Sequence, residues 1–388
     1  MNEDSNNFKD NQSRYRSITV IGLADTIGSG IAAVFWFYLA TLITPEQYGE
    51  LFFVLGIAGT ASLISLFGTE NTLTVYVAKN VKVQATLYFL SLIIGIISSL
   101  IIIIFFYRID ATLVLIGYII NSLAIGSLLG RKQFSSYAKY ILTQKILTLV
   151  LGIIFYYAFG VDGILYALAL SYSFFIIRIY KEFRSSKIDF SLLRSRFGFV
   201  TNNYVYNLSG GLIGNLDKLI MAPIVGFAIL GNYSLTMQIL SIMMMLPHIV
   251  FKYTLTHDAS GSQNLKIKKI TILASIGIVV LGITVLPHII PVLFPKYVDV
   301  IDAIKIMSLA VIPYTLTLLF SSKLLGLEKS KFVLIEKITA LCIMIGGIVI
   351  LGPLYGIIGI SIAFVLATSV GAIFLGYIIR SQSGLDAK

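Results

Sequence analysis

The sequence predicts an all-α integral membrane protein with about twelve spanning helices, arranged as two lobes of six. Three observations lead to this prediction. Hydrophobic residues make up 57% of the 388 residues and charged residues only 12%, whereas a soluble domain is roughly half apolar and about a quarter charged. Apolar runs long enough to cross a bilayer recur along the whole chain. Lys and Arg gather in every second connection between those runs.

Each expected spanning segment has the roughly 20 mostly apolar residues that a bilayer requires. The segments are approximately residues 18–43, 49–69, 84–107, 111–130, 136–158, 161–180, 197–222, 228–252, 269–292, 303–325, 332–352 and 355–379. Residues 1–17 are polar, and the apolar segment after them lacks the short core and small-residue cleavage site of a signal peptide. We therefore expect residues 1–17 to be a cytoplasmic tail.

The distribution of basic residues predicts the side on which each connection lies. If the N-terminus is cytoplasmic, the inner connections hold nearly all of the 29 Lys and Arg residues. Outer connections contain only Arg108, Lys296 and Lys305, while Lys145 and Lys218 fall within helices. A miscounted helix would swap the sides in one half and remove the asymmetry. The pattern therefore favours twelve helices with both termini in the cytoplasm, and it accounts for the net charge of +11 without a nucleic acid partner.

An internal repeat favours two similar halves. Residues 36–53 can be aligned with residues 218–235 at an offset of 182, close to half the chain length, which places Gly49 on Gly231. An even number of helices in each half makes the repeats parallel, related by an axis along the membrane normal. This arrangement is typical of transporters with two lobes and a cavity between them.

The expected domain boundaries follow from the repeat and the charge pattern. The longest inner connection, residues 181–196, lies near the chain midpoint and is expected to link the two lobes. The N-terminal lobe then comprises residues 18–180 and the C-terminal lobe residues 197–380, and residues 381–388 form a second cytoplasmic tail.

The seventh segment carries polar residues where lipid would exclude them. Asn203, Asn207, Gly210, Gly214 and Asp217 are spaced four, three, four and three residues apart, which places them on one face of a helix. Lys218 follows directly. A lipid-facing charge at mid-membrane costs roughly 2.5–3.5 kcal/mol on insertion scales, so this face is expected to line a polar cavity. Close helix packing and snorkelling of the charges toward the outer interface are alternatives.

Four further polar residues within spanning segments are candidates for the same cavity. Lys145, between apolar neighbours in the fifth segment, needs an acidic partner, water or an anionic ligand. Gln238 and His248 lie on a polar stripe of the eighth segment. Asp25, in the first segment, is a candidate ion-pair partner or ion-coupling site, unless it lies at the cytoplasmic end of the helix.

The sequence shows no constellation typical of an enzyme. It contains no P-loop motif for nucleotide phosphates and no H-E-x-x-H zinc motif. The three histidines, His248, His257 and His288, are not at metal-ligand spacing. The single cysteine, Cys342, excludes an intramolecular disulfide. We expect a transporter with no cofactor, no metal and no catalytic residues.

Two stretches resemble a known family. LATLITPEQYGELFFVLGIAGTASLISLFGTENTL (39–73) and NLDKLIMAPIVGFAILGNYSLTMQI (215–239) are similar to the first-to-second and seventh-to-eighth helix regions of O-antigen flippases of the Wzx type. These flippases belong to the multidrug/oligosaccharidyl-lipid/polysaccharide (MOP) exporter superfamily, so the resemblance implies a fold like that of its MATE members. Asp217 and Lys218 match the charged pair in the seventh helix of that family.

The resemblance also implies a function. Members of the family move undecaprenyl-diphosphate-linked oligosaccharide, such as an O-antigen or capsule repeat unit, from the inner to the outer leaflet of the bacterial inner membrane. Membrane lipid and other polysaccharide-assembly proteins would be partners. Three alternatives are a multidrug exporter of the same fold, a relative that transports lipid II, and a membrane-bound polysaccharide polymerase. The exporter would be expected to have an acidic cavity, and the polymerase a long outer loop with arginines. An assembly protein without transport is a further class.

Overall fold

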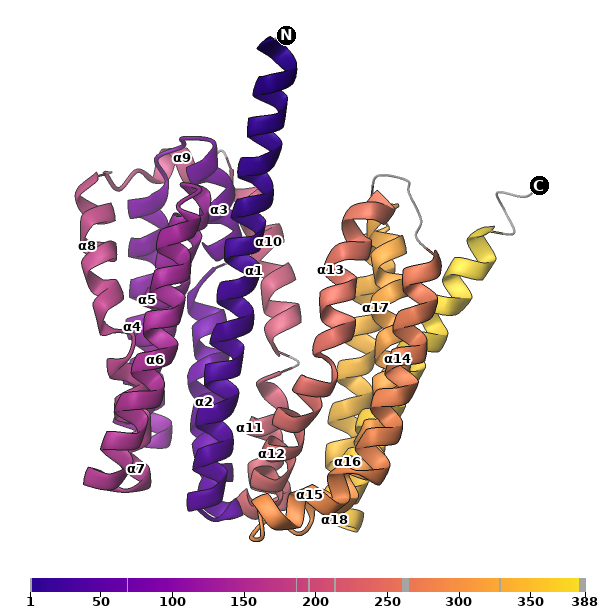
Figure 1. Cartoon of the computed structure of the whole chain (residues 1–388). Coiled ribbons are helices and arrows are strands. Elements are labelled where there is room, and N and C mark those ends of the chain that lie inside the picture. The colour runs from indigo at the N-terminus through magenta and orange to yellow at the C-terminus, as the bar shows by residue number, and fades with distance from the viewer. Residues whose placement is uncertain are drawn as a thin grey trace. The chain divides into compact units, whose positions relative to one another are not determined.

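The computed structural model describes residues 2–67, 69–185, 187–194, 196–212, 214–259, 265–327 and 329–383. These residues form helices joined by short connections, with no β-strand among them (Figure 1). The chain divides into two compact units. Unit 1 comprises Met1–Tyr38 and Val54–Asn215, and unit 2 comprises Leu39–Phe53 and Leu216–Lys388. The tips of the first two helices thus belong to the second unit.

Unit 1 is built from the first ten α-helices and one short 3-10 helix. They are α1 (Asn2–Leu42), α2 (Pro45–Ser65), α3 (Thr69–Ala78), α4 (Gln84–Phe106), α5 (Ile109–Gly130), α6 (Phe134–Phe159), α7 (Val161–Leu170), η1 (Ser173–Phe175), α8 (Ile176–Ser185), α9 (Phe190–Arg194) and α10 (Phe197–Leu212). Helix α5 is central, because it packs against α3, α4, α6, α7 and α8.

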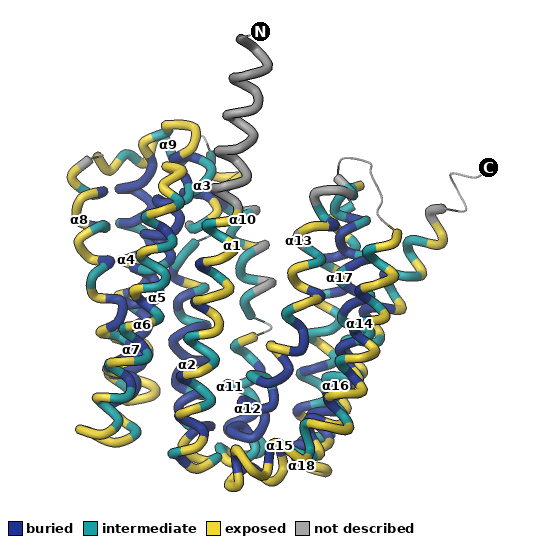
Figure 2. Tube along the Cα trace, in the orientation of Figure 1, coloured by how far each residue is buried: buried dark blue, intermediate teal, exposed yellow. Residues whose placement is uncertain are grey.

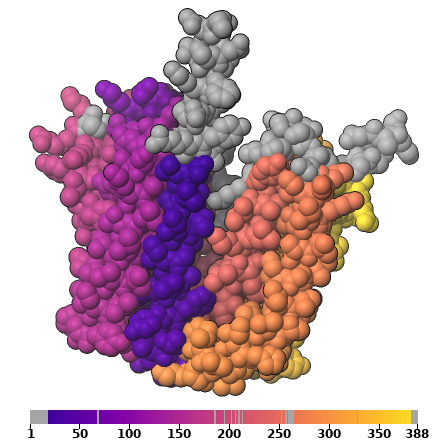
Figure 3. All heavy atoms as spheres, in the orientation of Figure 1, coloured from indigo at the N-terminus to yellow at the C-terminus, as the bar shows by residue number. Residues whose placement is uncertain are grey.

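Unit 2 contains the remaining helices together with the tips of α1 and α2. They are α11 (Leu216–Val225), α12 (Phe227–Met243), α13 (Met245–Ala259), α14 (Leu265–Thr284), α15 (Leu286–Leu293), α16 (Val300–Ser308), α17 (Val311–Gly326) and α18 (Ser330–Ser383). Helix α18 packs against α11, α16 and α17. In the space-filling view, the orange atoms of α14 to α16 form a continuous surface on the visible face of this unit (Figure 3).

The helix lengths confirm a protein with many membrane-spanning helices. Among the described residues, eight helices are long and apolar enough to cross a membrane, or ten if two bent helix pairs each count as one span. One of the eight, within α18, is bent at Gly356 (φ 57°, ψ −135°) and comprises two helices. At about 1.5 Å per residue a helix of that length would far exceed one bilayer. The total of twelve spans remains a prediction.

The first expected spanning segment agrees with the structure, whereas the seventh does not. A candidate span runs over Thr19–Leu42, and α1 continues from it to Asn2, since no Gly or Pro precedes Gly22 to interrupt the helix. The seventh segment forms two helices, α10 and α11, joined by a turn in which the N–H of Asn215 donates to the carbonyl of Leu212 (3.2 Å). Glycines at 210, 211 and 214 weaken the helix there by roughly 1 kcal/mol each.

The helices bury small and polar residues and expose large apolar ones. Helix α4 shows this clearly, because its buried face carries Ser91, Gly95 and Ser98 at helical spacing. The hydroxyl of Ser65 donates to Ser98 (3.1 Å), and Gly95 meets the Ile119 side chain. The opposite face, which includes Ile104 and Phe105, is exposed, and exposed and buried positions alternate along the helices (Figure 2). Small residues at helix contacts and apolar side chains outside are the arrangement expected in lipid.

The two glycines aligned by the repeat meet inside unit 2, where α2 and α12 cross. A Cβ on Gly49 would lie 2.8 Å from the Gly231 nitrogen and closer still to the carbonyl oxygen of Phe227. A Cβ on Gly231 would lie 3.0 Å from the Gly49 nitrogen and closer still to the carbonyl oxygen of Pro45. Pro45 and Phe227, the first residues of α2 and α12, are separated by the same offset as the two glycines. The crossing is therefore symmetric under the offset of 182 residues that aligns the two segments.

The turn between α1 and α2 is held by the connection between α15 and α16. The ammonium group of Lys296 donates to the carbonyl of Leu42 (2.7 Å), the last residue of α1. The hydroxyl of Tyr297 donates to the carbonyl of Ile43 (3.4 Å), and its ring packs edge-on against Tyr48. These contacts explain why residues 39–53 belong to unit 2.

Candidate functional site

The acidic residue predicted in the first helix lies at the contact of α1 with α6. Asp25 is partly buried and accepts a hydrogen bond from the hydroxyl of Tyr137 (2.7 Å). The same two helices meet again where the Phe35 ring covers Gly152. Tyr137 and Asp25 are 112 residues apart in the chain, so their contact is a result of helix packing.

Lys145 lies two turns further along α6 and its side chain packs on α1. A Cβ on Gly28 would meet the Lys145 Cγ at 3.4 Å, so the absence of a side chain on Gly28 leaves space for the lysine stem. Lys145 is partly buried. No hydrogen-bond or ion-pair partner for its ammonium group lies among the residues that the structure describes. A cation in this position can bind an anionic group.

The two predicted asparagines of α10 make different contacts in unit 1. The side-chain oxygen of Asn207 accepts a hydrogen bond from Asn71 (3.0 Å), whereas the Asn203 amide donates to the carbonyl of Phe199 on its own helix (3.0 Å). The neighbour of Asn71 is Glu70, whose carboxylate accepts a hydrogen bond from Ser122 (2.9 Å). Glu70 was missed from the sequence because it lies at the edge of a predicted segment.

Asp217 and Lys218 lie in the first turn of α11, in unit 2. The Asp217 carboxylate is buried and accepts hydrogen bonds from the Tyr233 hydroxyl (2.9 Å) and the Lys218 backbone N–H (2.8 Å). The Lys218 ammonium group is 3.6 Å from the same carboxylate. A negative charge at the start of a helix is also favoured by the helix dipole. The pair is thus held together, with Asp217 anchored to α12.

The end of α10 at Leu212 and the start of α11 at Leu216 change the predicted stripe. Asn203 and Asn207 belong to α10 in unit 1, while Asp217 and Lys218 belong to α11 in unit 2. The expectation that they share one continuous helical face is wrong, since the glycine-rich turn ends the first helix and starts a new one. Whether they line a common cavity remains a prediction.

The two candidates from the eighth segment also lie on separate helices of unit 2. Gln238, on α12, is partly buried, and His248, on α13, is exposed. The Nε2 atom of His248 is 2.6 Å from the Tyr314 hydroxyl on α17, and the two rings meet edge-on. The predicted site residues of unit 2 thus lie on three helices, α11, α12 and α13.

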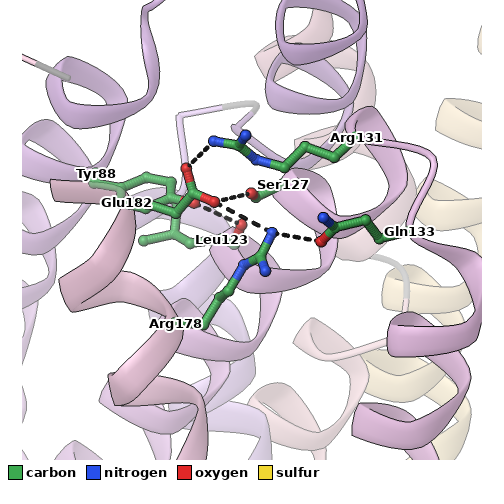
Figure 4. A network of polar contacts seen from close by, with 7 residues as sticks. All are labelled: Tyr88, Leu123, Ser127, Arg131, Gln133, Arg178 and Glu182. Carbon is green, nitrogen blue, oxygen red and sulfur yellow. Dashed lines mark hydrogen bonds and ion pairs between the residues drawn. The ribbon is translucent and has the colours of Figure 1, made fainter. Parts of the chain in front are cut away.

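A polar network that the sequence did not single out ties α8 to α5 in unit 1 (Figure 4). The buried carboxylate of Glu182 accepts a hydrogen bond from Ser127 (2.9 Å) and forms ion pairs with Arg131 (2.6 Å) and Arg178 (3.2 Å). Arg178 also donates to the side chain of Gln133 (2.9 Å). The buried carboxylate of Glu182 thus has its hydrogen-bond and ion-pair partners. Because Glu182 lies in the expected linker 181–196, these contacts hold the start of that linker against α5.

The described residues contain no group of three or more His, Cys, Asp or Glu side chains that could hold a metal ion. The arrangement in each unit is one of isolated charges and hydrogen-bonded polar pairs within a bundle of spanning helices. Charged and polar residues of this kind are rare in lipid-facing positions, and in membrane proteins they are typical of substrate and ion pathways.

The sequence model of a family described as polysaccharide biosynthesis proteins matches residues 15–256, more than half of the chain. The chain belongs to this polysaccharide biosynthesis protein family. The matched region includes Asp25, Lys145, Asp217 and Lys218. No curated protein matches the chain by sequence.

Solved structures with the same fold are transporters and flippases. The lipid II flippase MurJ, in an inward closed conformation, superposes on this polysaccharide biosynthesis protein with a TM-score of 0.77 and 12% identity, over 93% of this chain and 87% of MurJ. An inward-facing multidrug resistance MATE transporter of the MOP superfamily superposes with a TM-score of 0.66 and 18% identity. The match covers 95% of this chain and 98% of the transporter. A MOP superfamily transporter from Pyrococcus furiosus superposes with a TM-score of 0.57 and 18% identity, over 96% of each chain. That transporter is described as having a binding pocket of reverse polarity. The expected MATE-like fold is confirmed.

Proposed function

We propose that the protein is a flippase for undecaprenyl-diphosphate-linked oligosaccharide, such as an O-antigen or capsule repeat unit. It moves this substrate from the inner to the outer leaflet of the bacterial inner membrane by alternating access. Membership of a polysaccharide biosynthesis family and the fold of MOP transporters support this proposal.

The unpartnered ammonium group of Lys145 is the observation that carries the proposal. A diphosphate is strongly anionic and is costly to transfer across a layer of low dielectric constant. Lys145 lies in the middle of a spanning helix, and no described carboxylate is within ion-pair distance of it. Its charge therefore remains available to the diphosphate. Lys218, close to Asp217 at 3.6 Å, contributes a weaker positive field. A few cations suit a carrier, because binding must be weak enough for release.

Replacement of Lys145 in a strain that depends on this gene for its surface polysaccharide tests the proposal. Lys145→Ala should reduce the polysaccharide while the protein level is maintained, and Lys145→Arg should retain part of it because the positive charge remains. Lys139→Ala, at an exposed position on the same helix, is the matched control. A normal amount of surface polysaccharide with Lys145→Ala would show that Lys145 is not part of the site. A normal amount with both Lys145→Ala and Lys218→Ala would refute the proposal.

An ion-coupled multidrug exporter of the same fold is the second candidate. The carboxylates of Asp25 and Glu70 favour it, because the hydrogen bonds shown for them in unit 1 come from the neutral side chains Tyr137 and Ser122. Carboxylates of this kind attract a cationic drug or a coupling ion. Drug resistance that is lost with Asp25→Asn, together with unaltered surface polysaccharide, would support the exporter over the flippase.

The distribution of Lys and Arg predicts that both termini lie in the cytoplasm. A reporter fused after Lys388 should then be active only when it is of the cytoplasmic type. An active reporter of the external type would contradict the topology and the even number of spans.

A further inference from the structure

The C-terminal end of α8 exposes basic side chains directly after exposed apolar ones. Ile176, Ile177 and Tyr180 are each more than half exposed. They belong to a candidate membrane span that ends at Arg184, so lipid is the environment that suits them. Lys181 and Arg184, which follow on the same helix, are also exposed. This change from apolar to basic side chains is the one expected where a helix leaves the acyl chains and reaches the lipid headgroups.

The linker after α8 repeats this combination of apolar and basic side chains. Ile188 and Phe190 are each nearly half exposed, and Lys187 and Arg194, on either side of them in the sequence, are exposed as well. Figure 1 shows α9 at the same end of unit 1 as the C-terminal end of α8. Exposed apolar residues among cations are typical of segments that lie in the plane of a membrane interface.

Contacts with α4 hold this linker in place. The backbone N–H of Asp189 donates to the Thr86 hydroxyl (2.8 Å), and that hydroxyl donates to the Asp189 carbonyl (3.2 Å). The Asp189 carboxylate accepts hydrogen bonds from the backbone N–H (2.8 Å) and the hydroxyl (2.6 Å) of Ser191 at the start of α9. The exposure of Ile188 and Phe190 is therefore a fixed feature of unit 1.

The exposed cations of α8 and the linker form what we call the basic face, which comprises Lys181, Arg184, Lys187 and Arg194. None of the four forms an ion pair with a carboxylate of the described residues. By contrast, Arg178 and Arg131 share the buried Glu182 (Figure 4). Asp189, which caps α9, is the only acidic residue from 183 to 194. The basic face thus carries an excess of positive charge.

We propose that the basic face binds the phosphate groups of anionic phospholipids in the surrounding membrane. Each Lys or Arg near a membrane surface adds to the attraction for anionic headgroups, while Ile188 and Phe190 can enter between the acyl chains. An acidic protein segment would match the charge but would leave the apolar side chains without acyl chains around them. Membrane topology requires only a number of basic residues on one side, and it does not explain why these four stay unpaired beside exposed apolar residues.

Quenching of tryptophan fluorescence by brominated lipids tests this proposal in the full-length protein. The chain has one tryptophan, Trp36, so Trp36→Phe combined with Phe190→Trp reports only the lipids next to α9. The protein is placed in liposomes of phosphatidylglycerol and phosphatidylcholine in which one or the other lipid is brominated. Brominated phosphatidylglycerol should quench more strongly, with a binding constant about threefold or more above that of phosphatidylcholine.

The opposite end of α4 supplies the matched control. Phe105 is exposed there, and the neighbouring Arg108 is paired with Asp110 at 2.7 Å, so no unpaired cation lies beside it in the sequence. Trp36→Phe combined with Phe105→Trp should therefore be quenched equally by the two lipids.

Two further measurements connect the preference to the basic face. Replacement of its four cations by glutamine, in the Phe190→Trp protein, should abolish the preference for phosphatidylglycerol. An ionic strength of about 1 M, which screens charges beyond about 3 Å, should weaken the preference while all four cations are retained.

Equal quenching by the two lipids with Phe190→Trp would overturn the proposal and leave an acidic protein segment as the alternative occupant. A preference that persists without the four cations, or that salt does not weaken, would also overturn it. No substrate is present in these measurements, so their outcome is independent of the proposed flippase function.

Discussion

The crossing of α2 and α12 allows a sharp test of the fold, because it brings backbone against backbone. Gly49→Ala places a methyl group less than 3.0 Å from the Gly231 nitrogen and from the carbonyl of Phe227, a distance that real Cβ atoms essentially never show. Neither neighbouring atom belongs to a side chain that could rotate away. The two helices must therefore separate, and the ring contacts of Tyr48 with Tyr297 and of Phe53 with Phe227 must change with them.

The expected loss of stability follows from the cost of overpacking, about 1–3 kcal/mol. Gly30→Ala is the matched control, since no atom lies within 4 Å of a Cβ there. Alanine in a helix interior is favoured over glycine by about 1 kcal/mol, so Gly30→Ala should be neutral or stabilising. The two variants should thus differ by roughly 2–4 kcal/mol.

The fraction of monodisperse protein that remains after heating, measured by size-exclusion chromatography in detergent, gives the apparent Tm. Gly49→Ala and Gly231→Ala should each lower it relative to Gly30→Ala. The double variant should lose less than the sum of the two, because both methyl groups open the same crossing. Equal apparent Tm values for Gly49→Ala and Gly30→Ala would refute the close approach of the two helices.

Three other predictions concern single contacts. Glu182→Ala leaves Arg131 and Arg178 without their shared buried partner (Figure 4). It should lower the free energy of unfolding by about 3 kcal/mol, measured by thermal unfolding with Glu46→Ala as the control. A loss no larger than that of the control would contradict the stabilising role of the network. Tyr233→Phe removes a hydrogen bond to the buried Asp217 and should cost about 1–3 kcal/mol in the same assay, whereas an unchanged apparent Tm would show that the bond contributes nothing. Hydrogen bonds from the Ser191 hydroxyl and backbone N–H lower the pKa of Asp189 at the start of α9. The ionised carboxylate therefore stabilises α9 above the ordinary pKa of an aspartate, and this stabilisation is lost as the pH falls through the lowered value. Backbone hydrogen exchange of residues 187–194 should be slower in the wild-type protein than in Asp189→Asn at neutral pH, and the two rates should become equal in acid. A difference in rate that stays constant with pH would contradict this role of the Asp189 carboxylate.

Much of the fold follows from the sequence, because the cost of exposing backbone and charge to lipid is local. Apolar runs of the right length predicted the spanning helices α4, α5 and α6 to within two residues at each end. The offset between Gly49 and Gly231 predicted a repeat that the structure shows as a symmetric helix crossing. Neither inference required knowledge of which helices touch.

The same reasoning could not locate helix breaks or partners. The spacing of the polar residues from Asn203 to Asp217 predicts one helix. The glycines between them allow a turn, and the structure has two helices, α10 and α11, which belong to different units.

The sequence by itself determined the helices, their lipid-facing character, the repeat and the embedded charges, because each depends on the residues of one segment and on the bilayer. Only the tertiary structure decided that Tyr137 binds Asp25 and that Tyr233 holds Asp217. These pairings join residues far apart in the chain. They depend on which helix faces meet, and hydrophobic patterning leaves that choice open because every helix in a membrane is apolar on most of its surface.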